Sequence, residues 1–269
     1  AVLMELKVLN QGILKKKDAG GLVLSDDESV GITINGDDHI RIQVLEKGLN
    51  LMECYQRANR IDDHIGEHVD YAYDEKYGYL TAFPTNMGTG LRASVIVHLP
   101  MLSRRKNFNS LVADMGRFGT TIRGVYGEGS ENYGSLYRVS NQKTLGQTEK
   151  DIIDLISKAA TELSLQERRL RREALKHHAV ICADEAYKSY GVLKYARRLS
   201  KKEAMEYLSQ LMSGISSGIL EVTEPCSIHE LILGAQTANL LSHADRPLNK
   251  EEVDEARADF LREHLPEIR

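Results

Sequence analysis

The chain has 269 residues, of which 42% are hydrophobic and 28% charged, and its formal net charge is −4 at pH 7. This length suits one large domain or two small ones, and the composition is ordinary for a globular protein. A weakly acidic chain argues against a general nucleic-acid binder, whose domain is usually basic. The sequence has no apolar run of membrane-spanning length and no secretory signal at its start. We therefore expect neither a nucleic-acid nor a membrane partner.

Three cysteines, Cys54, Cys182 and Cys226, are far apart, and none belongs to a C-x-x-C pair. An odd number of scattered cysteines is typical of reduced thiols in a cytoplasmic protein. The pattern predicts no disulfide scaffold and no structural zinc site, and we assign no metal ligands from the sequence.

The first half of the chain reads as β-rich. Residues 21–25 and 29–34 are strand-like, and Asn35-Gly36 then separates them from the run DDHIRIQVLE. Asn-Gly between two apolar runs predicts a β-hairpin. Apolar residues at helical spacing predict a helix over 50–69. Further strands are expected at 78–83, 91–100, 120–129 and 135–142, with a helix at 102–115.

The second half of the chain reads as helical. Thr148 is suited to cap a helix that continues, with a break, through the charged run QERRLRREALKHH. More helices are expected at 183–198, 201–216, 227–241 and 249–264, with Ser200 and Asn249 as caps. Strands followed by helices predict an α+β fold. Since no flexible tether separates the β-rich part (1–146) from the helix-rich part (147–269), we expect one domain over 1–269.

Arginines accompany glycines in three of the predicted strands: Arg41, Arg92 and Arg123. A guanidinium binds phosphate oxygens through paired hydrogen bonds and keeps its charge, and phosphoryl transfer depends mainly on positioning and charge stabilisation. The sequence contains no P-loop and no protein-kinase motif. A lone strand arginine is most often solvated or ion-paired at the surface. The residues alone therefore indicate no more than an anion site.

Three longer segments, in this order, carry a resemblance to a known family: NGDDHIR, FPTNMGTGLRAS and RGVYGEGS. They are similar to the patterns N-E-E-D-H-x-R, C-P-T-N-x-G-T-G-x-R-A-S and R-G-x-x-G-E-G-S of the ATP:guanido phosphotransferases, which include creatine kinase, arginine kinase and bacterial protein-arginine kinases. The run S-N-Q-x-T-L-G at 140–146 and the segment YKSYG at 187–191 resemble the bacterial branch. The similarity extends over essentially the whole chain.

The resemblance implies an antiparallel β-sheet flanked by helices and transfer of the ATP γ-phosphoryl group, with Mg²⁺, to a guanidinium nitrogen. The implied substrate is arginine or an arginine-containing protein, and a homodimer is a further expectation. The implied catalytic residues are Asp37 and Glu128. The implied nucleotide-binding residues are Arg41, Arg92, Ala93, Ser94, Val95, Ile96, Arg123, Gly124, Val125, Tyr126, Gly127 and Glu128.

The chain departs from the family pattern at several places. Asp37 replaces a glutamate, and Phe83 stands where the family has a reactive cysteine. The family's early S-S-R-x-R-x-A-R-N segment is missing, so we expect the N-terminal part to be absent from this sequence. The R-D-x-x-R-A motif of protein-arginine kinases begins here with Val253. Two alternatives stay open beside the enzyme: a regulatory partner that binds nucleotide or phosphoarginine, and a structural remnant without a ligand.

Overall fold

The computed structural model describes residues 19–127 and 131–269. Its first sheet is antiparallel, in the order β1-β2-β3, and consists of β1 (Gly21–Leu24), β2 (Val30–Ile34) and β3 (Ile40–Val44). The predicted hairpin is confirmed: the backbone N–H of Asn35 donates to the His39 carbonyl at 2.8 Å, and Asn35 has a φ of 54°. The strand after this hairpin begins only at Ile40, so Asp37 and His39 lie in the connecting loop and not on the strand that carries Arg41.

Two more sheets follow. A short hairpin pairs β4 (Tyr73–Asp74) with β5 (Gly78–Tyr79), so most of the strand expected at 78–83 is loop. The third sheet has the order β6-β8-β7, with antiparallel pairs throughout. Its strands are β6 (Ser94–His98), β7 (Thr120–Gly124) and β8 (Leu136–Asn141). The described strands therefore form three antiparallel sheets, whereas the family resemblance implies one.

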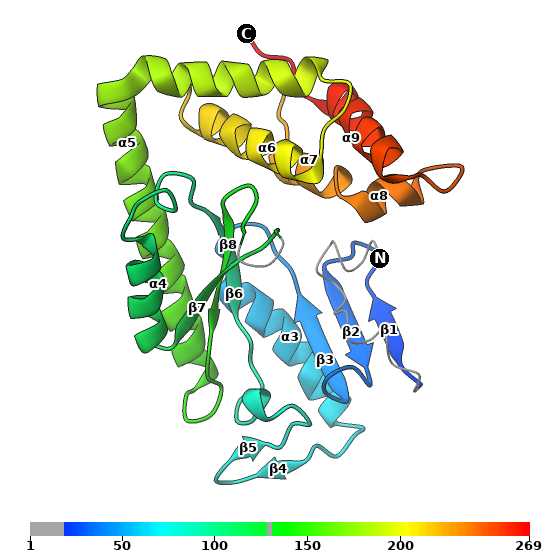
Figure 1. The fold of residues 1–269 in the computed structure, drawn as a ribbon. Helices are drawn as coiled ribbons and strands as arrows, with labels where there is room; N and C mark the ends of the chain where they lie inside the picture. Colours follow the sequence, from blue (N-terminus) through cyan, green and yellow to red (C-terminus); the bar gives the residue numbers. More distant parts are fainter. Residues whose placement is uncertain (1–18, 128–130) are drawn as a thin grey trace.

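Helices cover the sheets. α3 (Leu51–Gly66) packs on β3, and α4 (Phe108–Arg117) packs on β7 (Figure 1). The short 3₁₀ helix η1 (Pro84–Asn86) precedes β6. α4 begins at Phe108 instead of residue 102 because a turn precedes it, whose backbone amides at Met101 and Leu102 donate to the Glu167 carboxylate.

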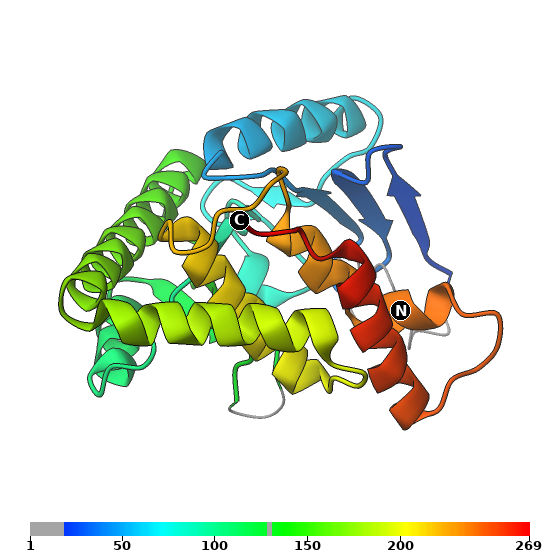
Figure 2. The same cartoon turned by 90° about the horizontal axis from the view of Figure 1, so that it is seen from above.

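One long helix joins the sheets to the C-terminal helices. α5 (Glu149–Tyr195) begins with a capping box in which Thr148 and Asp151 satisfy each other's backbone amides. It bends at His178, whose φ of −138° and ψ of 36° are not helical. Its first part runs along β6, β7 and β8, and its second part lies over α6 (Figures 1 and 2). The helix predicted at 183–198 is therefore the second part of α5.

The remaining helices form a layer above the third sheet (Figure 1). They are α6 (Lys201–Ser216), α7 (Ile228–Gly234), α8 (Thr237–Ser242) and α9 (Lys250–His264). Capping boxes begin α6 at Ser200 and α9 at Asn249, as the sequence predicts. The single helix expected at 227–241 is split, because Gln236 leaves the helical conformation with a ψ of 147°.

The third sheet has one buried face and one more open face. Val97, Ile122 and Val139 are buried in a core with residues of α4 and α5. Because side chains alternate along a strand, the neighbouring residues Ile96, Arg123 and Arg138 lie on the opposite face. The predicted α+β fold with antiparallel strands and flanking helices is confirmed, while the assignment of residues 1–269 to a single domain stays a prediction. In the described part of the chain, we find no helix with the length and apolar character that crossing a bilayer requires.

Candidate functional site

A row of side chains crosses the open face of the third sheet. Arg138, on the central strand β8, is the register partner of Ile96 on β6 and of Arg123 on β7. Arg123 is exposed, Arg138 is half-buried, and Ile96 is 45% exposed. The row places two guanidinium groups next to an accessible aliphatic side chain, an arrangement that suits a ligand with an anionic part and an apolar part.

Two more arginines extend this pair into a chain of four cations. Burial and the charge of Arg123 lower the pKa of Arg92. Burial and the charge of Arg41 lower the pKa of Arg138, and Tyr126 partly offsets this effect. The electrostatic coupling therefore runs from Arg92 to Arg123 on one side and from Arg138 to Arg41 on the other, and the strand register joins the two pairs.

This cluster has few counter-charges. Within residues 19–127 and 131–269, none of the four arginines forms an ion pair with a carboxylate. Arg41 donates to the Gln43 side chain at 3.4 Å. Arg123 and Arg138 make no side-chain hydrogen bond to another described residue. Neighbouring like charges repel, so this arrangement favours binding of an anion.

The side chain of Arg92 connects neighbouring segments of the site through hydrogen bonds. Its Nε donates to Asn86 Oδ1 at 3.0 Å, and its Nη2 donates to the Thr85 carbonyl at 3.0 Å. Its Nη1 donates to the carbonyls of Asn141 at 2.9 Å and Gln142 at 3.2 Å. Four of its five N–H groups thus hold η1 against the end of β8. A direct phosphate contact by Arg92 stays a prediction.

A second carboxylate beside Asp37 connects the loops of the site. Asp38 Oδ1 accepts a hydrogen bond from the Phe83 backbone N–H at 2.9 Å, and Asp38 Oδ2 accepts one from Asn86 Nδ2 at 2.7 Å. Asn86 also accepts from Arg92. The network therefore ties the hairpin loop that carries Asp37 to the loop that carries Phe83.

The other predicted residues differ in accessibility. Ser94 is exposed, whereas Ala93 is 6% exposed and Val95 packs against the core. Val125 and Tyr126 pack against the C-terminal helical core. Gly124 and Gly127 are exposed, and a side chain at either would clash, with Asn132 in the first case and with the Glu131 carbonyl in the second. Glu128 lies outside the described residues, and the predicted roles of all these positions remain predictions.

Sequence reasoning missed Arg138, Asp38 and Asn86. Arg138 follows an aromatic residue in the run LYRVSN, and strand alternation could have placed it opposite Arg123 only if the register had been known. Asp38 and Asn86 stand inside two of the recognised motifs. Their hydrogen bonds join residues 45 to 48 positions apart, a separation that no local pattern reveals.

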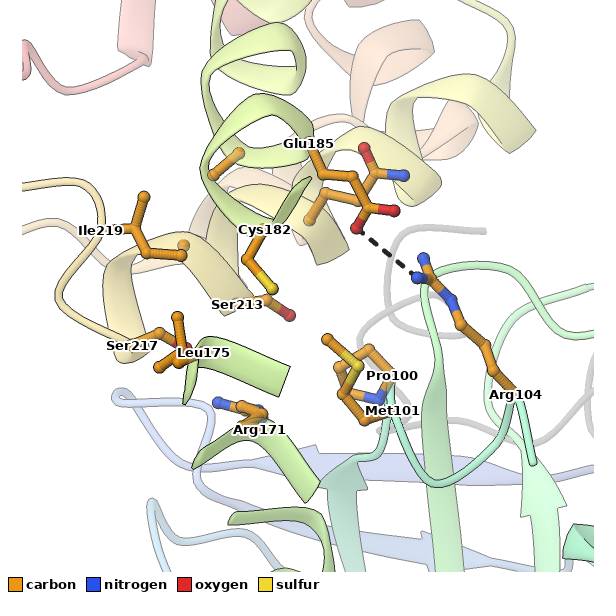
Figure 3. A pocket seen from close by; sticks show the side chains of 13 residues that line it. Pro100, Met101, Arg104, Arg171, Leu175, Cys182, Glu185, Ser213, Ser217 and Ile219 are labelled. Carbon is orange, nitrogen blue, oxygen red and sulfur yellow. Dashed lines mark ion pairs between the residues drawn. The ribbon is translucent and has the colours of Figure 1, made fainter. Parts of the chain in front are cut away.

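A small pocket lies elsewhere, between the turn before α4, the bend of α5 and α6 (Figure 3). Its wall includes Cys182, Ser213 and an ion pair of 3.5 Å between Arg104 and Glu185. Burial raises the pKa of the Cys182 thiol, which makes it a weak nucleophile. No predicted site residue in the described part of the chain lines this pocket.

Comparison with known proteins identifies the family. The sequence model of the ATP:guanido phosphotransferase C-terminal catalytic domain matches residues 1–170. The chain belongs to the ATP:guanido phosphotransferase family. A second family model, the protein-arginine kinase McsB C-terminal domain, matches residues 179–269. The gap between the two matched regions contains the bend of α5 at His178.

Curated members of this family resemble the chain over most of its length. It is 45% identical to the protein-arginine kinase of Staphylococcus epidermidis over 252 residues, which are 94% of this chain and 74% of that protein. It is 41% identical to the protein-arginine kinases of Desulforamulus reducens and Shouchella clausii, each over 98% of this chain and 74% of the relative.

Solved structures of the family share the fold. Lombricine kinase superposes with a TM-score of 0.56 at 28% identity, over 64% of this chain and 50% of that chain. The duplicated taurocyamine kinase of Schistosoma mansoni with bound transition-state analogue components gives a TM-score of 0.56 at 24% identity, over 72% of this chain and 30% of that chain. The chain thus spans about three quarters of its curated relatives and half or less of these two structures.

Proposed function

We propose that this chain transfers the γ-phosphoryl group of ATP to a guanidinium nitrogen of arginine in proteins. The observation that carries the proposal is the cluster of Arg41, Arg92, Arg123 and Arg138, without carboxylate partners among the described residues, in a member of this family. The relatives named protein-arginine kinase support arginine as the phosphoryl acceptor.

The arginines act by charge and position. ATP carries several negative charges, and guanidinium groups bind phosphate oxygens with directional hydrogen bonds. Arg123 and Arg138 lie on neighbouring strands of a sheet, so their backbone positions are fixed relative to each other before ATP binds. Because phosphoryl transfer depends mostly on in-line geometry and charge stabilisation, such a preformed cradle supplies the main requirement.

Two carboxylates would orient the acceptor. Asp37 and Glu128 can hold the cationic guanidinium through bidentate hydrogen bonds, and one of them can accept the proton lost as the N–P bond forms. Asp37 is one methylene shorter than the glutamate of the family, which shortens its reach by about 1.5 Å. The hydrogen bonds of Asp38 to Phe83 and Asn86 fix the backbone beside Asp37 and so limit how far its loop can shift.

Mg²⁺ would arrive with ATP. It prefers phosphate oxygens, water and one or two carboxylates. The described cluster is rich in guanidinium groups, so its residues fit the phosphate oxygens of the complex better than the metal itself. The metal would offset phosphate charge, while Arg41, Arg123 and Arg138 would hold the remaining phosphate oxygens.

The decisive experiment measures phosphoarginine formation from ATP on an arginine-rich protein. We expect Glu128→Gln to lower the rate by about a hundredfold or more, since it removes both alignment and a proton acceptor. Asp37→Glu should raise the rate by restoring reach. Glu131→Gln is the matched control, because Glu131 is exposed and paired with Lys202 at 3.3 Å; its rate should stay within twofold of wild type.

Two results would change the proposal. Activity that survives Glu128→Gln would overturn the mechanism. Inactivity of the wild type and of Asp37→Glu would favour the regulatory alternative, which the comparisons do not support. We further propose a cytoplasmic location, which fits three separate free thiols, and we retain the homodimer as a prediction for sedimentation measurements.

A further inference from the structure

Three metal-ligating side chains meet at the end of α3: His64, Glu67 and His68. Their ligand atoms all lie within 4.8 Å of one another, and His64 Nδ1 is 3.5 Å from Glu67 Oε2. The spacing i, i+3, i+4 brings such side chains to one face of a helical turn. None of the predicted phosphate-binding residues that the structure describes belongs to this cluster, so it is a separate feature.

The donor set has a definite chemical preference. Imidazole nitrogens combined with one carboxylate oxygen suit Zn²⁺ and related transition metals, whereas Mg²⁺ prefers oxygen ligands alone. Tetrahedral Zn²⁺ holds its ligands about 3.4 Å apart, given metal–ligand distances of about 2.0 to 2.1 Å. The side chains of His64 and Glu67 are 76% and 69% exposed, so small rotations can close the remaining gap without disturbing a core.

A hydrogen bond to the helix fixes the tautomer of His68. Its Nδ1 lies 3.0 Å from the His64 backbone carbonyl oxygen. A carbonyl only accepts hydrogen bonds, so Nδ1 must carry the proton, and the lone pair of the neutral ring is then on Nε2. A metal-bound histidine typically donates its other ring nitrogen in this way, which fixes the tautomer and the ring direction.

Charges of both signs flank the cluster in sequence. Asp62, Asp63 and Asp70 are acidic, whereas Arg60 lies one helical turn before His64. The simpler explanation is an exposed His64–Glu67 ion pair, which contributes little to stability. In that case His68 only donates to a carbonyl four residues earlier, as His243 and His264 do at other helix ends. The edge-to-face contact of the two imidazole rings, with centroids 5.2 Å apart, keeps both rings at the same helix end.

We propose that His64, Glu67 and His68 form a binding site for a divalent transition-metal ion of the Zn²⁺ type, with water completing the coordination. The bound ion would cross-link the last turn of α3 to the segment that leads to β4 (Figure 1). The H-x-x-E-H spacing of these residues is visible in the sequence, although the scattered cysteines predict no zinc site.

The test uses the full chain, freed of metal and kept without ATP, titrated with Zn²⁺ against a chromophoric chelator. We expect one Zn²⁺ per chain, bound at least about tenfold more weakly by His64→Ala and by His68→Ala. Zn²⁺ should raise the melting temperature of the wild type but not of these variants. The matched control is His177→Ala, whose exposed imidazole on α5 lies outside the cluster.

The variants distinguish Zn²⁺ binding at this cluster from Zn²⁺ binding at any exposed histidine. Equal Zn²⁺ affinity in the wild type and in both cluster variants would overturn the proposal, as would an equal loss in His177→Ala or no binding by the wild type. X-ray absorption of the loaded chain should show two imidazole ligands, and a shell of oxygen ligands alone would also overturn it. These measurements do not involve phosphoryl transfer, so their result is independent of the kinase proposal.

Discussion

Arg123 and Arg138 face each other on neighbouring strands of the third sheet. Like charges directly opposite in a sheet are destabilising. Among the described residues, no carboxylate pairs with either side chain, and Arg138 is partly desolvated as well, which lowers its pKa. The unliganded chain therefore bears an electrostatic cost that an anionic ligand would remove.

Replacing Arg138 with glutamine should weaken nucleotide binding without destabilising the unliganded chain. Arg138→Gln keeps a polar side chain but removes the charge, so we expect Mg-ADP to bind roughly 10- to 100-fold more weakly, equivalent to about 1.5 to 3 kcal/mol for a charge-assisted contact. The unliganded variant should unfold at an equal or higher urea concentration than the wild type. Calorimetry and urea titration give the two numbers.

Arg117→Gln is the control for that variant, because Arg117 on α4 is exposed and pairs with Asp114 at 3.2 Å. It should leave nucleotide affinity unchanged. If Arg138→Gln binds Mg-ADP as tightly as the wild type, Arg138 does not belong to the nucleotide site.

Phe83 occupies the position at which the family pattern has a cysteine. Phe83 is 48% exposed, and its backbone N–H donates to Asp38. The phenyl group cannot supply the thiolate that the family's cysteine offers at this position. In the proposed mechanism, alignment of the guanidinium therefore falls to Asp37 and Glu128, whose roles stay predictions.

At the scale of elements, local signals predicted what local interactions decide. Thr148, Ser200 and Asn249 cap helices as expected, because a capping box involves residues only three positions apart. The arginines on β3 and β7 could also be placed from short motifs and alternation.

Features that the sequence did not predict depend on contacts between residues far apart in the chain. The helix expected from residue 102 starts at Phe108, because the preceding turn is held by Glu167, which is 65 and 66 positions away. The sequence predicts a break in the helix that follows Thr148 but not its place; the structure puts the bend at His178, and the second part of α5 packs against α6. The pairing of Arg138 with Arg123 required the strand register.

Glu167 gives a test of such a long-range contact. Its carboxylate is 2% exposed, accepts the Leu102 backbone N–H at 2.8 Å and pairs with Arg171 at 3.0 Å. Glu167→Ala leaves buried donors without partners, so we expect the free energy of unfolding to fall by about 3 kcal/mol in urea titrations. Glu162→Ala, an exposed position on the same helix, should cost at most about 0.5 kcal/mol. A loss below about 1 kcal/mol for Glu167→Ala would show that the turn does not depend on this carboxylate.

At the scale of the whole molecule, the third sheet contacts the layer of C-terminal helices at His98. This residue ends β6, and its Nε2 lies 2.8 Å from Ser209 Oγ on α6. Leu136, its register partner on β8, belongs to the core of the C-terminal helices. The contact therefore links the strands that carry the arginine cluster to the layer above them.

His98 should make the stability of this junction depend on pH. Burial, together with the charges of Arg171 and His229, lowers the pKa of His98 to about 3. In the unfolded chain the pKa returns to about 6.5, so between these values the unfolded state binds more protons. The free energy of unfolding is therefore fully supported above pH 6.5 and falls as the pH decreases through this window. We expect His98 to contribute a loss of about 2 kcal/mol between pH 7 and pH 5.

His98→Gln retains hydrogen-bonding groups but does not titrate. Its free energy of unfolding, measured by urea titration, should therefore fall by about 2 kcal/mol less than that of the wild type between these two pH values. His243→Gln, an exposed substitution on the same helical layer, should keep the wild-type pH dependence. Equal pH dependence in His98→Gln and the wild type would mean that His98 is not held neutral at the junction.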